Sequence, residues 1–233
     1  WVGEGVQVPA LLSALDDVKE SVQDAALQAL RRLGQREPQP LIEAFQNSLC
    51  DHCPLLAEIL GQISAPNVMD ALLRGLQNPS GLVRAASAES LGRGSDLRAI
   101  EPLVASLEDL DPAVRRASAD ALGQLKAIEA TAPLLHLLED PVPEVRDAAA
   151  QAVACLGTAE VMEHLVSLLQ HCRPDVREAA IRALGLIEDP AADTYLIEAL
   201  ELPDVALQRQ AAALLGQRRV VQSRAALEQA LRS

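Results

Sequence analysis

One short pattern returns at a fixed interval along most of this chain, and that interval restricts the fold more than any other feature. Residues 110–125 read LDPAVRRASADALGQL, and related segments follow at 143–156 and 174–187. A Val-Arg pair recurs every 31 residues, and a glycine or alanine follows each arginine by eight residues. The arginines are Arg84, Arg115, Arg146 and Arg177. A period in this range indicates stacked supersecondary units rather than one irregular core.

Each unit has the pattern of two helices. Residues 97–110 place apolar side chains at helical spacing, and residues 112–125 follow with Pro112 in the first turn, where its missing N–H costs nothing. The second helix should bury one face, which consists of Val114, Ser118, Ala121, Leu122 and Leu125. The glycine position either marks a tight crossing between helices or ends the helix.

The composition supports a purely helical fold. Aromatic residues make up only 1% of the 233 residues, so the apolar content is mostly alanine, leucine and valine. Alanine and leucine favour helices, whereas aromatic and β-branched residues favour strands. We therefore expect an all-α fold, an α-α superhelix of about seven and a half two-helix repeats. It would form one domain over residues 1–233, with residues 221–233 as a final single helix.

At these residues the chain resembles the HEAT-like repeat family, in the short form first described in phycobilin lyases. That form has the pattern D-P-x-V-R-x-x-A-x-x-A-L-G-x-L, and residues 111–125 and 174–187 are similar to it. The resemblance implies a right-handed α-solenoid whose second helices line a concave side. It also implies membership among lyase subunits, phycobilisome-turnover factors and assembly adaptors.

The repeated arginines allow two interpretations. They could form an anion-binding row, or they could bind carboxylates and so fix the register between units. Asn78, Asp109 and Asp140 lie six residues before arginines and also keep the 31-residue step. Because a carboxylate at this position can reach the arginine of its own or the next unit, we favour the structural interpretation.

The exposed face of the second helices is the candidate binding surface. The first and fifth positions after each arginine lie one helical turn apart, opposite the core. We expect a concave strip for a protein partner there, although a solvated face with mutual ion pairs fits the same residues. The candidates are Glu89, Arg116, Asp120, Asp147, Gln151, Glu178, Arg182 and Arg209.

The second unit departs from the pattern and carries weak metal-ligand candidates. Cys50, His52 and Cys53 lie together in the segment CDHC. One C-x-x-C without a second pair is a weak signal, because zinc requires about four ligands. We favour a packing irregularity over a metal or redox site. Of the other cysteines, Cys155 is expected to be buried and Cys172 to lie in an exposed turn.

Charge and motif content exclude several classes of function. A net charge of −13 disfavours a nucleic-acid partner, and no apolar run is long enough for membrane insertion. The N-terminal segment lacks the features of a signal peptide, and four irregularly spaced cysteines predict no disulfide framework, so we expect a cytoplasmic protein. No phosphate-binding loop, serine-hydrolase elbow or dinucleotide fingerprint is present in the sequence.

These observations favour a protein-binding scaffold, such as an adaptor, chaperone or assembly factor, over an enzyme, and they predict no cofactor. The resemblance adds an alternative, an E/F-type phycobilin lyase subunit or a related chromophore-handling protein. Its partners would be a phycobiliprotein or a second solenoid subunit. A metal- or redox-sensing module built on Cys50 and Cys53 is the third hypothesis.

Overall fold

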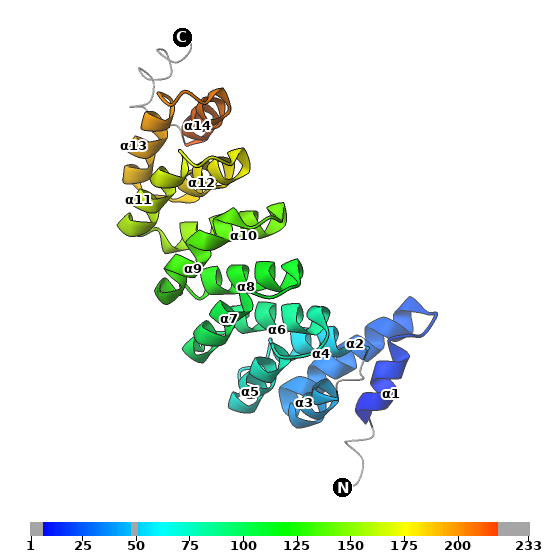
Figure 1. The fold of residues 1–233 in the computed structure, drawn as a ribbon. Coiled ribbons are helices and arrows are strands. Elements are labelled where there is room, and N and C mark those ends of the chain that lie inside the picture. Colours follow the sequence, from blue (N-terminus) through cyan, green and yellow to red (C-terminus); the bar gives the residue numbers. More distant parts are fainter. Residues whose placement is uncertain (1–6, 48–50, 219–233) are drawn as a thin grey trace. The chain divides into compact units, whose positions relative to one another are not determined.

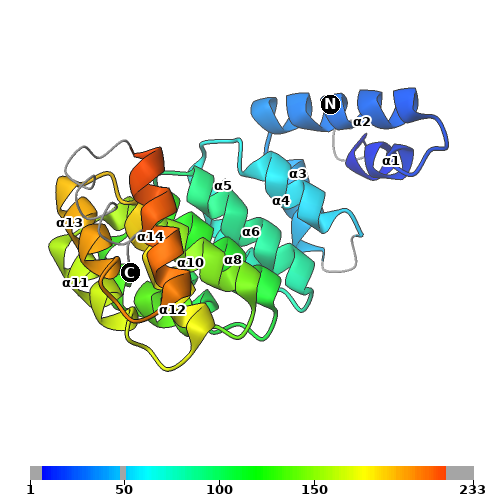
Figure 2. The same cartoon turned by 90° about the horizontal axis from the view of Figure 1, so that it is seen from above.

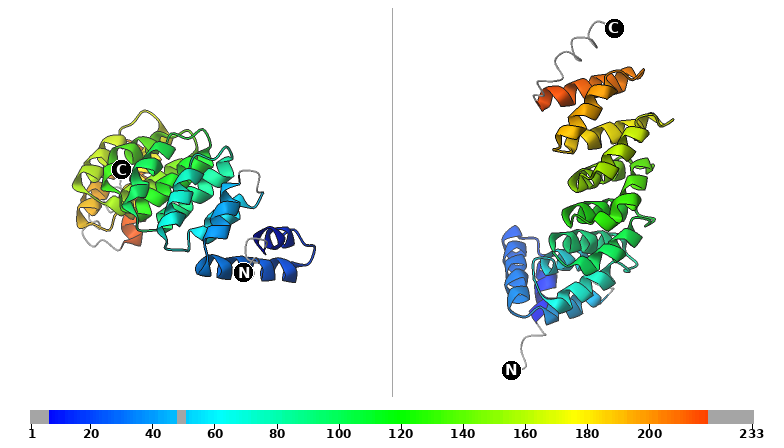
Figure 3. Two further views of the ribbon diagram at one scale, coloured as in Figure 1. Left: turned by 90° about the horizontal axis from the view of Figure 1, so that it is seen from below. Right: turned by 90° about the vertical axis from the view of Figure 1, so that its left-hand side faces the viewer.

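The computed structural model describes residues 7–47 and 51–218, and these residues are helical with short connecting loops and no strand (Figure 1, Figure 3). Within these ranges the chain contains 14 α-helices and three 3-10 helices. The predicted all-α solenoid of two-helix repeats is confirmed.

The helices follow one another as seven pairs in the part of the chain that the structure describes. The first helices are α1 (Gln7–Ala14), α3 (Gln39–Gln46), α5 (Pro66–Gly75), α7 (Ile100–Ser106), α9 (Thr131–His136), α11 (Ala159–Leu168) and α13 (Pro190–Ala199). The second helices are α2 (Glu20–Arg36), α4 (Cys53–Leu60), α6 (Gly81–Arg93), α8 (Pro112–Gln124), α10 (Pro143–Leu156), α12 (Pro174–Leu186) and α14 (Val205–Gln217). The 3-10 turns are η1 (Leu97–Ala99), η2 (Ile128–Ala130) and η3 (Leu137–Glu139). The predicted final helix lies outside the described residues.

The chain divides into two compact units, Trp1–Ala121 and Leu122–Ser233, and each is described by itself. In the first unit α4 packs against α6, and in the second α10 packs against α12 and α12 against α14 (Figure 2). Second helices of successive repeats are therefore direct neighbours within each unit. The expectation of a single domain over residues 1–233 stays a prediction.

The helix starts follow from the sequence. Pro112, Pro143 and Pro174 are the first residues of α8, α10 and α12, where no N–H is needed. Other helices begin at a capping carboxylate, since Asp204 accepts hydrogen bonds from the first backbone N–H groups of α14 and Asp189 does so for α13. These residues therefore account for the starts of α8, α10, α12, α13 and α14.

The predicted inner face of α8 is buried almost completely. Val114, Ser118 and Leu122 have no exposed surface, and Ala121 is 1% exposed. Leu125 is only half-buried, because it lies beyond the last residue of the helix. The helical period therefore identified the core positions within α8. It failed for Leu125, because the helix ends before this residue.

The glycine position marks a tight crossing between neighbouring second helices. A Cβ added to Gly123 would lie 2.8 Å from the Cα of Ala152, and one added to Gly185 would lie 2.6 Å from Leu214. Gly61 follows the last residue of α4 and lies in the same way against Ser90. In each case the neighbour lies 29 residues farther along, so one close approach is repeated from unit to unit.

The repeated arginines fix the loop that precedes their own helix. The Nη1 of Arg84 donates to the carbonyl oxygens of Asn78 and Pro79, at 2.9 and 3.1 Å. Arg115, Arg146 and Arg177 bind the carbonyl oxygens six and five residues before them in the same way. This repeated contact within each unit is made by backbone oxygens rather than by the predicted carboxylate.

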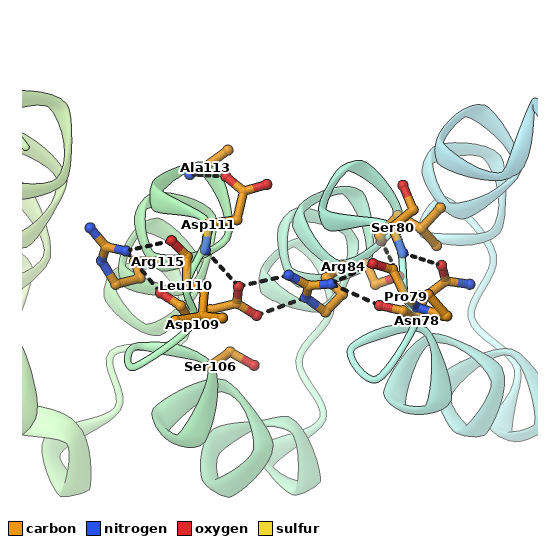
Figure 4. A network of polar contacts seen from close by, with 12 residues as sticks. Asn78, Pro79, Ser80, Arg84, Ser106, Asp109, Leu110, Asp111, Ala113 and Arg115 are labelled. Atoms are coloured by element: carbon orange, nitrogen blue, oxygen red, sulfur yellow. Dashed lines mark hydrogen bonds and ion pairs between the residues drawn. The ribbon is translucent and has the colours of Figure 1, made fainter.

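The remaining guanidinium donors reach the next repeat. Arg84 binds both carboxylate oxygens of Asp109, each at 2.7 Å, and Asp109 also accepts the backbone N–H of Asp111 (Figure 4). Arg177 binds Asp204 at 2.8 Å, and Arg146 lies 3.4 Å from Asp175. These arginines and their acceptors, called the arginine ladder below, link successive repeats within each unit. The structural interpretation is confirmed.

The ladder shifts the pKa values of its members. Hydrogen bonding to Arg84 lowers the pKa of Asp109 below its ordinary range, and Asp109 in turn raises the pKa of Arg84. The hydrogen bond from Arg177 lowers the pKa of Asp204. Both carboxylates are therefore held in the charged form that the ladder needs.

Candidate protein-binding surface

The eight predicted binding residues lie on second helices in both units. They are called the outer strip below, because they lie on the solvent-facing side of these helices; they are the residues of the predicted concave strip. In the first unit Glu89 is on α6, and Arg116 and Asp120 are on α8. Arg116 is exposed and lies 3.8 Å from Glu89, and Arg93 lies at the same distance from that carboxylate. The carboxylate of Glu89 is therefore compensated by one arginine of its own helix and one of the neighbouring helix, in ion pairs that are longer than hydrogen bonds.

Asp120 differs from the other members of the outer strip in the first unit. Its side chain is half-buried, and burial raises the pKa of Asp120 above its usual range. The charge of Arg116 opposes this rise, and that of Glu89 adds to it. Asp120 is thus less available to a partner than Arg116 is.

In the second unit the strip contains one ion-pair cluster. Arg182 of α12 bridges Asp147 of α10 and Glu178 of its own helix, the latter at 3.3 Å. The side chain of Arg182 is 40% exposed, so the cluster is accessible to solvent. The structure thus brings three predicted residues from two helices together.

Two further residues of the strip project from this unit. Gln151 on α10 and Arg209 on α14 are exposed. Within the described part of the chain, neither makes a side-chain hydrogen bond or an ion pair. Their side-chain donors and acceptors are therefore open to a partner.

The weak metal candidates of the second repeat separate in the structure. His52 Nε2 lies 3.2 Å from a carboxylate oxygen of Asp16, whereas Cys53 is 1% exposed and its Sγ lies 3.5 Å from the carbonyl oxygen of Phe45. Cys50 lies outside the described residues. Among those that are described, no three His, Cys, Asp or Glu side chains come together as a metal site would require.

The remaining cysteines divide between one correct and one wrong prediction. Cys172 is exposed in the turn before α12, as expected. Cys155 is also exposed, contrary to the prediction of a buried side chain. The reason is its place in the last turn of α10, past the contact of Ala152 with Gly123.

An open pocket of about 560 Å³ lies in the first unit, and no motif predicted it. It is lined by residues 61–65, 94–96 and 98 together with parts of α5 and α6. The sequence signal is Gly94, which falls where the repeat before and the three repeats after have isoleucine or leucine. As for membranes, the described helices include none with the length and apolar character needed to cross a bilayer.

Comparisons with known proteins agree with this architecture. The family model for HEAT repeats matches residues 69–154, 100–173 and 162–233. No curated protein matches the sequence.

Two solved structures illustrate the likeness. The Escherichia coli protein YibA is 26% identical, with 95% of this chain and 88% of that chain covered and a TM-score of 0.58. The complex of CpcE and CpcF of phycocyanin lyase from Nostoc sp. PCC7120 gives 21% identity, 90% and 76% coverage and a TM-score of 0.47.

Proposed function

The chain belongs to the HEAT-repeat family, and on that premise we propose that it is a non-catalytic scaffold that binds a partner protein along the outer strip. In the cell such a protein would serve as an adaptor, chaperone or assembly factor. Repeat proteins present extended surfaces that no single repeat provides, and each repeat adds side chains to the same face.

One observation carries the proposal. The outer strip occurs on the second helices of successive repeats, and none of its side chains belongs to the buried core. The contacts that it makes between helices are solvent-accessible ion pairs. Arg182, Asp147 and Glu178 contact each other, while Gln151 and Arg209 project into solvent. Such a surface is free to specify a partner, because changing it leaves the core intact.

The charges of the strip suggest the kind of contact. Both signs occur: within the second unit Asp147 and Glu178 are negative, whereas Arg182 and Arg209 are positive. A partner with mixed charges would exchange the weak internal ion pairs for its own. Contacts of this type set specificity and association rate more than affinity.

A second candidate function is supported by the sequence pattern. Residues 111–125 and 174–187 match the short repeat form of phycobilin lyases. The corresponding proposal is an E/F-type lyase subunit or a related phycobilisome chromophore-handling or turnover protein, acting with a second solenoid subunit. Mixing the purified protein with a linear tetrapyrrole and recording its visible absorption tests this, since a bound bilin shifts its bands and an unbound one does not.

The scaffold proposal is tested by crosslinking and a binding assay. A photoreactive side chain placed at Gln151 should crosslink a host protein, whereas the same group at Glu163, exposed on α11, should not. The identified partner is then purified and titrated. We expect Arg209→Glu to weaken its binding at least about tenfold, because reversing the charge places like charges opposite each other, which costs more than losing one favourable contact.

The matched control is Glu163→Lys, which also reverses an exposed charge but lies on a first helix. Its affinity should equal that of the wild type. Crosslinks from position 163 alone, or equal affinity of the Arg209→Glu variant, would place the interface elsewhere and overturn the proposal.

A further inference from the structure

The open pocket in the first unit has an apolar floor and a cationic rim. Val68, Leu72 and Leu91 form the floor, each 3% exposed or less. Arg93 and Arg98 lie on the rim. A volume of about 560 Å³ falls in the range of ligand pockets, roughly 300–1,000 Å³.

The pocket occurs where one repeat lacks a side chain that the others have. The repeat before and the three repeats after hold an aliphatic residue at the position equivalent to 94, and these residues are Ile63, Leu125, Leu156 and Ile187. The first and last 31-residue steps reach arginine, at Arg32 and Arg218, and glycine is present at 94 alone. The four aliphatic residues are at least half-buried, and Ile187 is 2% exposed.

The preceding repeat shows what such a side chain does. The Cδ1 of Ile63 would lie 2.9 Å from a Cβ added to Gly34, so this isoleucine fills the space beside the second helix of its neighbour. One step of 31 residues converts this pair into Gly94 and Ala65, and both line the pocket. The opening is therefore the space that an aliphatic side chain fills elsewhere.

The backbone does not require glycine at this position. Gly94 has φ −76° and ψ 178°, an extended conformation that any residue adopts. An added Cβ would meet one atom within 4 Å, the carbonyl oxygen of Leu91 at 3.3 Å. The local backbone conformation therefore does not explain why this position is glycine.

The two arginines distinguish this junction from the neighbouring ones. Between positions 62 and 217, positions equivalent to Arg93 hold glutamine, cysteine or leucine, and those equivalent to Arg98 hold asparagine, glutamate or alanine. Only the first repeat has arginine at both steps, at Arg31 and Arg36. Arg98 is engaged by Asp96 at 2.7 Å and by Asp70 at 3.1 Å. Within the described residues Arg93 contacts one carboxylate, that of Glu89, at 3.8 Å, which exceeds a hydrogen bond. Its guanidinium therefore keeps donors for an anion.

We propose that this pocket is a second binding site, which receives a leucine or isoleucine side chain of a partner polypeptide with a carboxylate beside it. The aliphatic group occupies the space left open at Gly94, on the floor of Val68 and Leu72. Arg93 binds the carboxylate. The site lies in the loops between repeats, and it does not depend on a partner at the outer strip.

The probe is N-acetylleucine, which combines an isobutyl group with a carboxylate, and its control is N-acetylleucinamide. Titrated into the ¹⁵N-labelled protein, the acid should shift the backbone amide resonances of Gly94, Ser95 and loop 61–65 to saturation. The amide should bind at least about fivefold more weakly, because it cannot accept a charge-assisted hydrogen bond from Arg93.

Three variants locate the interaction. Gly94→Leu fills the pocket from within and should abolish the saturable shifts, and Gly94→Ala, a smaller change, should weaken them. Arg93→Gln should remove the preference for the acid over the amide. Arg74→Gln is the matched control, since Arg74 is exposed on α5 and does not line the pocket; its binding should be unchanged.

Four results would overturn the proposal: no saturable shift, equal binding of acid and amide, unchanged binding by Gly94→Leu, or an unchanged preference in Arg93→Gln. If Gly94→Leu does not fold, Gly94→Ala and Arg93→Gln still decide the outcome, because each makes a smaller change at the same site.

Discussion

The two sides of the second helices differ in how much their residues vary between repeats. On the buried side of α12, Val176, Ile181 and Leu184 have no exposed surface, and equivalent positions in α8 and α10 hold similar small or aliphatic residues. On the outer side, the position after the repeated arginine holds Ala85, Arg116, Asp147 or Glu178. Packing restricts the residue types on the buried side, whereas residues on the outer side differ between repeats even in the sign of their charge.

This difference separates stability from recognition along the same helix. A buried position must fit the neighbouring helix at atomic distance, so its residue type is narrow. An outer position faces solvent, where ion pairs contribute little to folding. Substitutions on the two sides should therefore differ in size, and the predictions below measure that difference.

The largest loss of stability should follow Leu122→Ala. Leu122 is fully buried, so truncation removes packed methyl groups and leaves a cavity. We expect the free energy of unfolding in urea to fall by about 2–5 kcal/mol. A loss below about 1 kcal/mol would show that this face of α8 is not the packed one.

A pair of glycine variants tests the helix crossings. Gly123→Ala should cost about 1–3 kcal/mol, because its Cβ would lie 2.8 Å from the backbone of Ala152, which cannot move aside as a flexible side chain does. Gly216→Ala on α14 meets no described atom within 4 Å and should stabilise by about 0.5–1 kcal/mol. Thermal denaturation of the two should give shifts of opposite sign; equal shifts would remove the crossing as an explanation for the glycine position.

A substitution in the arginine ladder should reduce stability by less than one on the buried side and by more than one on the outer side. Asp109→Asn removes the charge that Arg84 binds through two hydrogen bonds, and the Asp109 side chain is only 15% exposed. We expect a loss of about 1–3 kcal/mol at neutral pH, measured by urea unfolding. Asp24→Asn, at an exposed carboxylate of α2, should change stability little.

The same variant has a defined pH dependence. Because Arg84 lowers the folded-state pKa of Asp109, the contribution of the pair is complete above about pH 4 and is lost as the pH falls through that folded-state pKa. The gap between wild type and Asp109→Asn should therefore narrow on acidification. A gap that is constant from neutral pH to about pH 2 would mean that the ion pair does not stabilise the fold.

The sequence predicted what depends on the repeated pattern. A period that recurs in valine, arginine and glycine positions fixes the hairpins and the inner face, since Val114, Ser118 and Leu122 are buried as expected. It also indicated Asp109 as an acceptor for a repeated arginine, but for that of its own or the next unit, whereas Asp109 binds Arg84 of the preceding unit. These features follow from one local rule that is applied again in each repeat.

Features that depart from the pattern were harder to foresee. The acceptors of Arg146 and Arg177 are Asp175 and Asp204, which lie at different positions of their own repeats because a flexible guanidinium can reach either. The side-chain surroundings of Cys155 depend on where α10 ends. Gly94 was visible in the sequence as an exception, but only the structure shows that its missing side chain leaves a pocket.

The smallest effect on stability should come from Arg182→Ala. Its ion pairs with Asp147 and Glu178 join side chains that are 40% to 50% exposed, so water and salt replace most of their attraction. We expect the free energy of unfolding to change by less than about 1 kcal/mol, and the change to shrink further in high salt.

The neighbouring Ile181→Ala supplies the contrast within one helix. Ile181 is one residue away and fully buried, so its truncation should cost about 2–5 kcal/mol. If Arg182→Ala cost as much as Ile181→Ala, the outer strip would be part of the packed structure. It could then no longer be assigned to a partner, because a side chain that holds neighbouring helices together is not free to specify what binds them.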